Sequence, residues 1–220
     1  MILRVLLVAP ELPGIDAEPE LRAITAAHQV TVLSGRVTAR DIYQQAREGP
    51  HRILHFATHS SDDAVQLSEG ESLTPDDVAQ IGRLTGAGLV CFNSCRSGLL
   101  ANYAVRHGLD YAVYCNVELP DAQGWKMPQA FYDFLRDQGG SIADYAAAFY
   151  RADSGQGVYG LAVSPQMISS WQTILEELKR HRDEIDALRR ELDRFILAQR
   201  VTVGVLAAAA ALALGGMILH

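Results

Sequence analysis

The sequence predicts an α/β fold with a mainly parallel central sheet, followed by a long heptad helix and one membrane-spanning helix. Three observations lead to this prediction. Short apolar runs alternate with amphipathic stretches up to residue 163, apolar residues then follow a heptad spacing, and residues 201–219 are almost entirely apolar. We therefore expect three parts: an α/β domain at 1–163, a stalk helix at 166–200 and a membrane tail at 201–219.

Six apolar runs of strand length lie in the first part: Leu3–Val8, Gln29–Leu33, Arg52–Ala57, Gly88–Asn93, Tyr111–Asn116 and Gly157–Val163. Stretches with helical patterning lie between them: Glu18–Ala27, Thr38–Glu48, Pro75–Arg83, Gly98–His107, Pro128–Gln138 and Ser141–Ala152. The first run is short and interrupted by Arg4, which indicates a buried strand rather than a signal peptide. Because strands alternate with helices, we expect βαβ units and a parallel sheet.

The heptad region carries eight core positions at alternating spacings of three and four: Trp171, Ile174, Leu178, His181, Ile185, Leu188, Leu192 and Phe195. Charged residues fill the positions between them, as in a coiled coil. A helix packed against its own domain can show the same stripe, and that alternative stays open. Unbroken heptads leading into an apolar tail favour a stalk, so we expect a homo-oligomer formed through residues 166–200. His181 would specify register or make assembly sensitive to pH.

The tail from Val201 to Leu219 has Thr202 as its only polar side chain. A helix of this length spans roughly 28 Å at about 1.5 Å per residue, close to the hydrocarbon thickness of a bilayer. Basic residues cluster before the tail, at Arg189, Arg190, Arg194 and Arg200. Because positive residues stay in the cytoplasm, we expect a single-pass tail anchor in the inner (plasma) membrane with a cytoplasmic α/β domain.

The composition of the chain excludes several classes of binding partner. The net charge is −7 and the isoelectric point is about 5.4, so nucleic acid is not an expected partner. Three cysteines at spacings of 4 and 20 form neither a disulfide framework nor a CxxC zinc pattern, which favours a reducing compartment. The sequence shows no nucleotide-binding motif. We expect no metal and no cofactor.

Two segments, Leu54–Ser60 and Val90–Gly98, are apolar runs that turn abruptly polar. They deliver His59 and Cys95 to the carboxyl ends of two parallel strands, which meet at one edge of such a sheet. A thiol at a helix N-terminus favours thiolate, and a nearby histidine can act as base and then acid. The backbone N–H groups of Ser60 and Cys95 could stabilise an oxyanion. This pattern indicates a cysteine hydrolase.

The other two cysteines, Cys91 and Cys115, lie inside strand runs and are typical of small buried hydrophobic residues.

Two signatures carry a family resemblance. Residues Ile53–Ser60 resemble the "HFATHG" signature and Asn93–Gly98 the "NACxSG" signature of CHAT domains, which belong to the caspase-like (clan CD) cysteine peptidases. The stretch 66–77 is similar to the hairpin and following helix of that family, and the stretches 130–135 and 139–146 are similar to its last helices, so the resemblance covers about residues 50–152. It implies a caspase-like three-layer sandwich.

The resemblance also implies roles for individual residues. His59 would be the general base and Cys95 the nucleophile. His55 would be a buried supporting residue, and Asn93 would order the turn before the nucleophile. Ser60 stands where the family has glycine, and Ser94 stands where it has another small residue.

The segment from Val117 to Asp121 differs from the Trp-containing run that is usual in the family. It would help to line the specificity pocket. There, Glu118 and Asp121 would favour a basic residue before the scissile bond.

These expectations combine into a membrane-anchored cysteine endopeptidase that cleaves a partner protein. The family context points to a bacterial defence or programmed-death pathway, with an activating partner protein. Two alternatives stay open: a catalytically silent CHAT-like interaction module, and an assembly whose tails permeabilise the membrane.

Overall fold

The computed structural model describes residues 2–218 except 62, 119–124, 139–141 and 154–157. For residues 142, 143, 193 and 196–218 it describes the backbone alone. The chain divides into two compact units, Met1–Ile168 and Ser169–His220.

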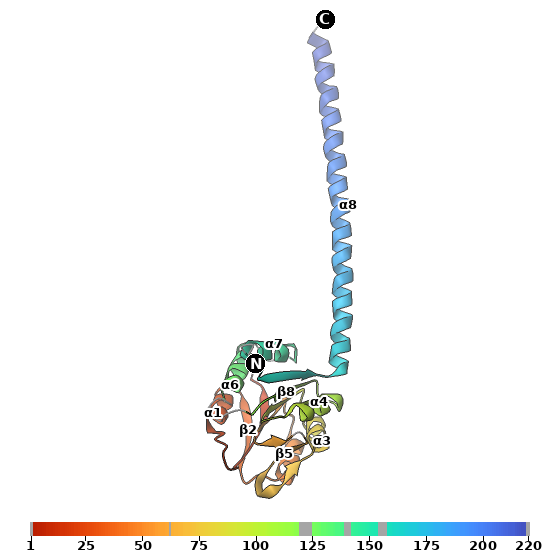
Figure 1. Ribbon diagram of the computed structural model, residues 1–220. Helices are drawn as coiled ribbons and strands as arrows, with labels where there is room; N and C mark the ends of the chain where they lie inside the picture. The colour runs from red at the N-terminus through yellow and green to blue at the C-terminus, as the bar shows by residue number, and fades with distance from the viewer. Residues whose placement is uncertain (1, 62, 119–124, 139–141, 154–157, 219–220) are drawn as a thin grey trace. The chain divides into compact units, whose positions relative to one another are not determined.

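The first unit contains a six-stranded sheet with the order β2-β1-β3-β7-β8-β9 (Figure 1). The strands are β1 (Arg4–Pro10), β2 (Gln29–Gly35), β3 (Ile53–Ala57), β7 (Leu89–Asn93), β8 (Tyr111–Cys115) and β9 (Tyr159–Val163). Neighbouring strands pair in parallel from β2 to β8, and β9 pairs antiparallel with β8. The predicted mainly parallel sheet is confirmed, and each predicted strand lies within about two residues of an observed one.

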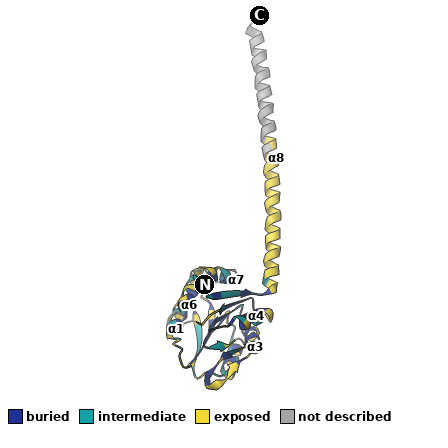
Figure 2. Ribbon diagram, in the orientation of Figure 1, coloured by how far each residue is buried: buried dark blue, intermediate teal, exposed yellow. Residues whose placement is uncertain are grey.

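Helices pack on both faces of this sheet. One face packs against α2 (Ala39–Glu48), α3 (Pro75–Thr85) and α4 (Gly98–Arg106). The other packs against α1 (Glu18–Ala27), α6 (Lys126–Gln138) and α7 (Ile142–Ala152). Along β1, Leu6 and Val8 enter the first core while Val5 and Leu7 enter the second, because strand side chains alternate between faces. The result is three layers with a buried sheet (Figure 2).

Two helix starts follow directly from local sequence. Thr38 and Thr74 each accept a hydrogen bond from the backbone N–H three residues later, and Asp41 and Asp77 bond back to the capping residue. These capping boxes satisfy N–H groups that the first helical turn would otherwise leave unpaired. The sequence Thr74–Asp77 therefore explains why α3 begins at Pro75.

A small antiparallel sheet follows β3. It consists of β4 (Ser60–Ser61), β5 (Ala64–Gln66) and β6 (Ser72–Leu73) in the order β4-β5-β6. The hairpin is consistent with the family resemblance, but two- and three-residue strands are too short to show a period of two in the sequence.

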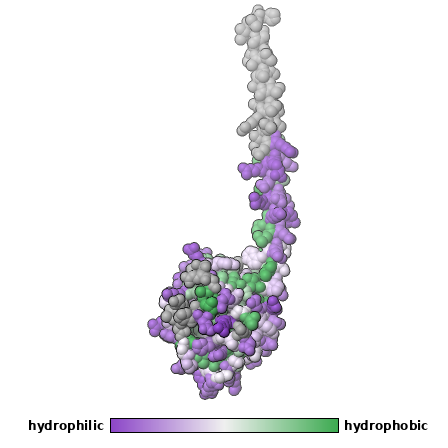
Figure 3. Space-filling model, in the orientation of Figure 1, coloured by the Kyte–Doolittle hydropathy of each residue, from purple (hydrophilic) through white to green (hydrophobic). Residues whose placement is uncertain are grey.

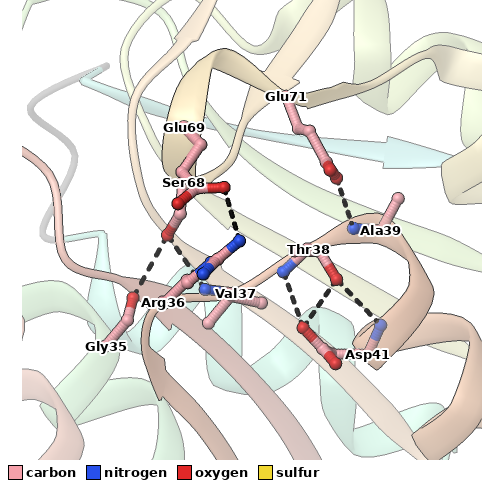
Figure 4. A network of polar contacts seen from close by, with 9 residues as sticks. All are labelled: Gly35, Arg36, Val37, Thr38, Ala39, Asp41, Ser68, Glu69 and Glu71. Atoms are coloured by element: carbon pink, nitrogen blue, oxygen red, sulfur yellow. Dashed lines mark hydrogen bonds and ion pairs between the residues drawn. The ribbon is translucent and has the colours of Figure 1, made fainter.

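The loop of this hairpin is fastened to the chain that leads into α2 (Figure 4). The Ser68 hydroxyl donates to the Gly35 carbonyl and accepts from the Val37 N–H at 2.9 Å. Glu71 accepts from the Ala39 N–H at 3.0 Å. These bonds hold the hairpin, and with it the residues that directly follow β3, in a fixed place.

The helix α8 runs from Pro165 to Ile218. Every side chain described from Ile168 to Phe195 is exposed (Figure 2). Among the residues whose side chains the structure describes, no helix is both long and apolar enough to cross a membrane. The expected span at 201–219 lies outside those residues.

Candidate active site

The candidate site forms where β3 and β7 end. Ala57 of β3 is in register with Asn93 of β7, and His59 and Cys95 each follow two residues later. The two side chains therefore leave neighbouring parallel strands at the same level, and both line one open pocket. The other lining residues are Ile15, Asp16, Ala17, Glu20, Ala57, Thr58, Asn93, Ser94 and Trp125.

The imidazole of His59 is oriented by a backbone carbonyl. Its Nε2 lies 3.0 Å from the carbonyl oxygen of Pro13, which follows β1. A carbonyl can only accept a hydrogen bond, so Nε2 is the donor, and in the neutral imidazole the lone pair is on Nδ1. The loop after β1 thus selects the tautomer in which Nδ1 can act as a base.

Burial separates Cys95 from the other two cysteines. Cys91 and Cys115 are buried, and desolvation raises the pKa of the Cys91 thiol to about 12 and also raises the pKa of Cys115. Both thiols stay protonated at neutral pH and face the protein interior. Cys95 is half-buried, lines the pocket and lies three residues before α4 begins. It is the cysteine that a substrate can reach.

Ser60 connects the two loops of the site. Its hydroxyl donates a 2.6 Å hydrogen bond to the carbonyl oxygen of Cys95. Among described non-glycine residues, φ is positive only at Glu69 and Arg96, so Ser60 occupies its position in β4 without a left-handed backbone. The glycine that the family has here is therefore not required for the backbone path of this chain.

The loop that carries His59 is also fixed. The Gln66 N–H donates to the His59 carbonyl at 2.9 Å, and the Thr58 hydroxyl donates to the Gln66 carbonyl at 2.7 Å. Thr58 and Gln66 thus join the end of β3 to β5.

The turn that carries Cys95 is pinned to β8 by a buried serine. The Ser97 hydroxyl donates to the Ser94 carbonyl at 2.9 Å and accepts from the Cys115 N–H at 3.1 Å. Between Cys95 and Ser97, Arg96 has φ of 52°, a left-handed conformation that is costly for a residue with a side chain. The turn is therefore held in a single, strained path.

A buried polar network, which we call the inner network, lies beside the pocket. Glu20 accepts from Asn93 Nδ2 at 2.8 Å and lies 2.7 Å from His55 Nε2. His55 Nδ1 lies 2.9 Å from the Tyr132 hydroxyl, and the Tyr159 hydroxyl donates to Asn93 Oδ1 at 2.8 Å. His55 and Asn93, expected as supporting residues, are thus linked to each other through Glu20.

Three residues of the site could not be expected from the sequence. Glu20, in the first turn of α1, has the pattern of a surface residue that complements the helix dipole. Pro13 contributes only a backbone carbonyl. Trp125 lines the pocket but belongs to no recognisable motif.

Of the two residues expected at the specificity pocket, the structure describes one, Glu118. Glu118 is exposed and forms a 2.9 Å ion pair with Arg96, and it is not among the pocket-lining residues. Asp121 lies outside the described residues. Among the described residues, the acidic side chains that line the pocket are Asp16 and Glu20.

Within the described ranges, no group of three or more His, Cys, Asp or Glu side chains could hold a metal ion. A layered α/β domain with a histidine and a cysteine at adjacent strand ends is compatible with a cysteine hydrolase. Residues 4–152 match the CHAT domain, and because this is more than half of the chain, the protein belongs to the CHAT-domain family. The expected resemblance is confirmed, and the family is related to the caspase-like peptidases. A search of curated proteins gave no match.

Proposed function

We propose that this protein is a cysteine endopeptidase in which Cys95 is the nucleophile and His59 the general base. One observation carries the proposal: both side chains line the same pocket, and the Pro13 carbonyl leaves His59 Nδ1 available as a base. Of the three cysteines, Cys95 alone lines that pocket. The shared pocket supports nucleophilic catalysis, which needs an accessible thiol and an oriented base.

The reaction would proceed in two steps. His59 Nδ1 takes the thiol proton while Cys95 Sγ bonds to the scissile carbonyl carbon, and the backbone N–H groups of Ser60 and Cys95 stabilise the oxyanion. The C–N bond then breaks, the leaving amine takes the proton from His59, and a thioester remains. Water, deprotonated by His59, hydrolyses the thioester and restores the thiol.

The pocket favours a basic residue before the scissile bond. Glu20 and Asp16 both line it, and Glu20 is buried. Each oxygen of the Glu20 carboxylate has one hydrogen-bond partner from His55 or Asn93, and each has a second lone pair. A lysine or arginine side chain would complete this acceptor set with a charge-assisted hydrogen bond.

The proposal includes a membrane setting. Residues 201–219 would anchor the chain, with the basic residues that precede them holding the CHAT domain in the cytoplasm. An enzyme so placed would cut a partner protein in a bacterial defence or programmed-death pathway, where an activating protein would raise the basal activity of the chain.

The test is cleavage of fluorogenic peptides by the full chain in detergent. We expect hydrolysis after arginine or lysine, and loss of hydrolysis in Cys95→Ala and in His59→Ala. Cys91→Ala is the matched control and should cleave, because its thiol is buried and protonated. Cleavage that survives in Cys95→Ala would refute the nucleophile assignment. Folded protein that cleaves nothing would favour the silent interaction module.

A further inference from the structure

The described part of α8 carries an apolar seam, which we define as the seven apolar core positions of the heptads. They are Trp171, Ile174, Leu178, Ile185, Leu188, Leu192 and Phe195, and each is between 41 % and 65 % exposed. Hydrophilic residues cover much of the rest of this stretch (Figure 3). A contiguous seam of this kind is stable in water only when a partner covers it.

The charges beside the seam identify the partner and its direction. With Trp171 at position a, the g positions are Glu177, Glu184 and Glu191, and the e positions between them are Arg182 and Arg189. In a parallel, in-register pair, each g residue faces the e residue five positions later in the partner. Glu177 would face Arg182 and Glu184 would face Arg189, so both of these pairs are of opposite charge, while Glu191 would face the uncharged Ile196.

An antiparallel pair would place these charges badly. There, g residues face g residues and e residues face e residues, so glutamate would meet glutamate and arginine would meet arginine. Like charges at these positions destabilise a pair. Glu184 also lies 3.8 Å from Arg180 on its own helix, but both side chains are more than half exposed, so this pair is weak.

We propose that residues 171–195 bind the same residues of a second copy of this chain, in parallel and in register. His181 then meets His181 of the second copy in one core layer, between the layers of Leu178 and Ile185. Such a polar layer disfavours any other register, because a shifted register would bury the imidazole of His181 against an aliphatic side chain. A tail anchor would give independent support, since every copy would then enter the membrane in the same direction.

Disulfide trapping in the full chain tests direction and register together. The variant His181→Cys in a Cys95→Ala background should form a disulfide dimer on mild oxidation, because the two sulfur atoms share one layer. Ala187→Cys in the same background is the control: position c faces away from the seam and should remain reduced. Equal cross-linking of both variants, or of neither, would overturn the proposal.

Charge exchange gives a second test that does not depend on sulfur chemistry. Glu184→Arg should raise the dimer dissociation constant about tenfold, because two attractive pairs become repulsive. Adding Arg189→Glu should restore affinity by recreating opposite charges. The measurement is sedimentation equilibrium of the full chain in detergent. A strict monomer, as expected if α8 packed on its own domain, would overturn the proposal, as would a double variant no tighter than Glu184→Arg. Neither result would bear on the activity of Cys95.

Discussion

The Ser60 hydroxyl donates a 2.6 Å hydrogen bond to the carbonyl oxygen of Cys95. This bond joins the loop after β3 to the loop after β7, and so connects the segment of the proposed base, His59, to the segment of the proposed nucleophile, Cys95. A glycine at position 60 could supply the same backbone N–H but not this tie. The serine thus adds a constraint that is specific to this chain.

Ser60→Ala should keep the backbone path and remove the tie. We expect the free energy of unfolding to fall by about 1 kcal/mol, the net contribution of one hydrogen bond. We expect kcat/KM for peptide cleavage to fall about tenfold, because the nucleophile turn is less well placed. Ser61→Ala, which removes an exposed bond to Asp63, is the control and should change neither quantity. Wild-type kinetics in Ser60→Ala would show that the tie has no role.

The inner network predicts that alanine substitution of Glu20 lowers the free energy of unfolding much more than alanine substitution of the nearby Glu18. Glu20→Ala removes the buried carboxylate that binds His55 Nε2 and Asn93 Nδ2, so the free energy of unfolding should fall by about 3 kcal/mol. Glu18→Ala removes an exposed ion pair with Arg22 and should cost about 0.5 kcal/mol. Urea unfolding followed by circular dichroism measures both. Equal losses would mean that the network does not stabilise the fold.

The variant Asp16→Asn tests substrate specificity and should change the stability of the fold very little. Asp16 is exposed and lines the pocket. In Asp16→Asn, the side-chain oxygen can still accept from the Glu18 N–H, but the negative charge is lost. We expect the preference for arginine over a neutral residue before the scissile bond to fall about threefold. Profiling with a peptide library checks this. An unchanged preference would place the specificity determinant elsewhere.

Two buried histidines predict acid sensitivity. Desolvation lowers the pKa of His28 and of His51 below 6.5. Between pH 6.5 and the lowered pKa values, the unfolded chain binds more protons than the folded one. The free energy of unfolding that these two histidines contribute is therefore fully present above pH 6.5. It falls as the pH drops from there through the lowered pKa values of the folded state. Urea unfolding between pH 7.5 and pH 5 should show this decline, and constant stability over that range would contradict it.

The membrane expectation rests on the tail. Deleting residues 201–219 should move the protein from the membrane fraction, resistant to carbonate extraction, to the soluble fraction. Replacing the same residues with an unrelated apolar span of equal length should restore membrane binding. A soluble full-length chain would contradict the anchor.

The parts of the fold that are predictable from the sequence are those encoded by patterns of neighbouring residues. Buried strands such as Ile53–Ala57 and Leu89–Asn93 are continuous apolar runs, and Thr74 marks the start of α3 through a capping box. The proximity of His59 and Cys95 is predictable from the sequence because both follow parallel strands, and the carboxyl ends of parallel strands lie at the same edge of the sheet. The direction of the last strand is not predictable in this way. Nothing in the sequence Tyr159–Val163 distinguishes an antiparallel strand from a parallel one, and β9 pairs antiparallel with β8.

The rest of the site depends on contacts between distant segments. Pro13 orients His59 through a carbonyl that every residue has, and 46 positions separate the two. Glu20 is buried only because His55, 35 positions later, and Asn93 surround its carboxylate. The order of residues along the chain places Glu118 and Asp121 after β8, but it does not show which side chains enter the pocket. Glu118 is instead neutralised by Arg96 at the surface.

Covalent labelling tests the central claim most directly. The full chain is treated with a thiol-reactive peptide probe that ends in arginine, and the modified residue is identified by mass spectrometry. The account predicts a single adduct on Cys95, lost in His59→Ala and retained in Cys91→Ala. An adduct on Cys91 or Cys115, or folded protein in which Cys95 does not react, would contradict it.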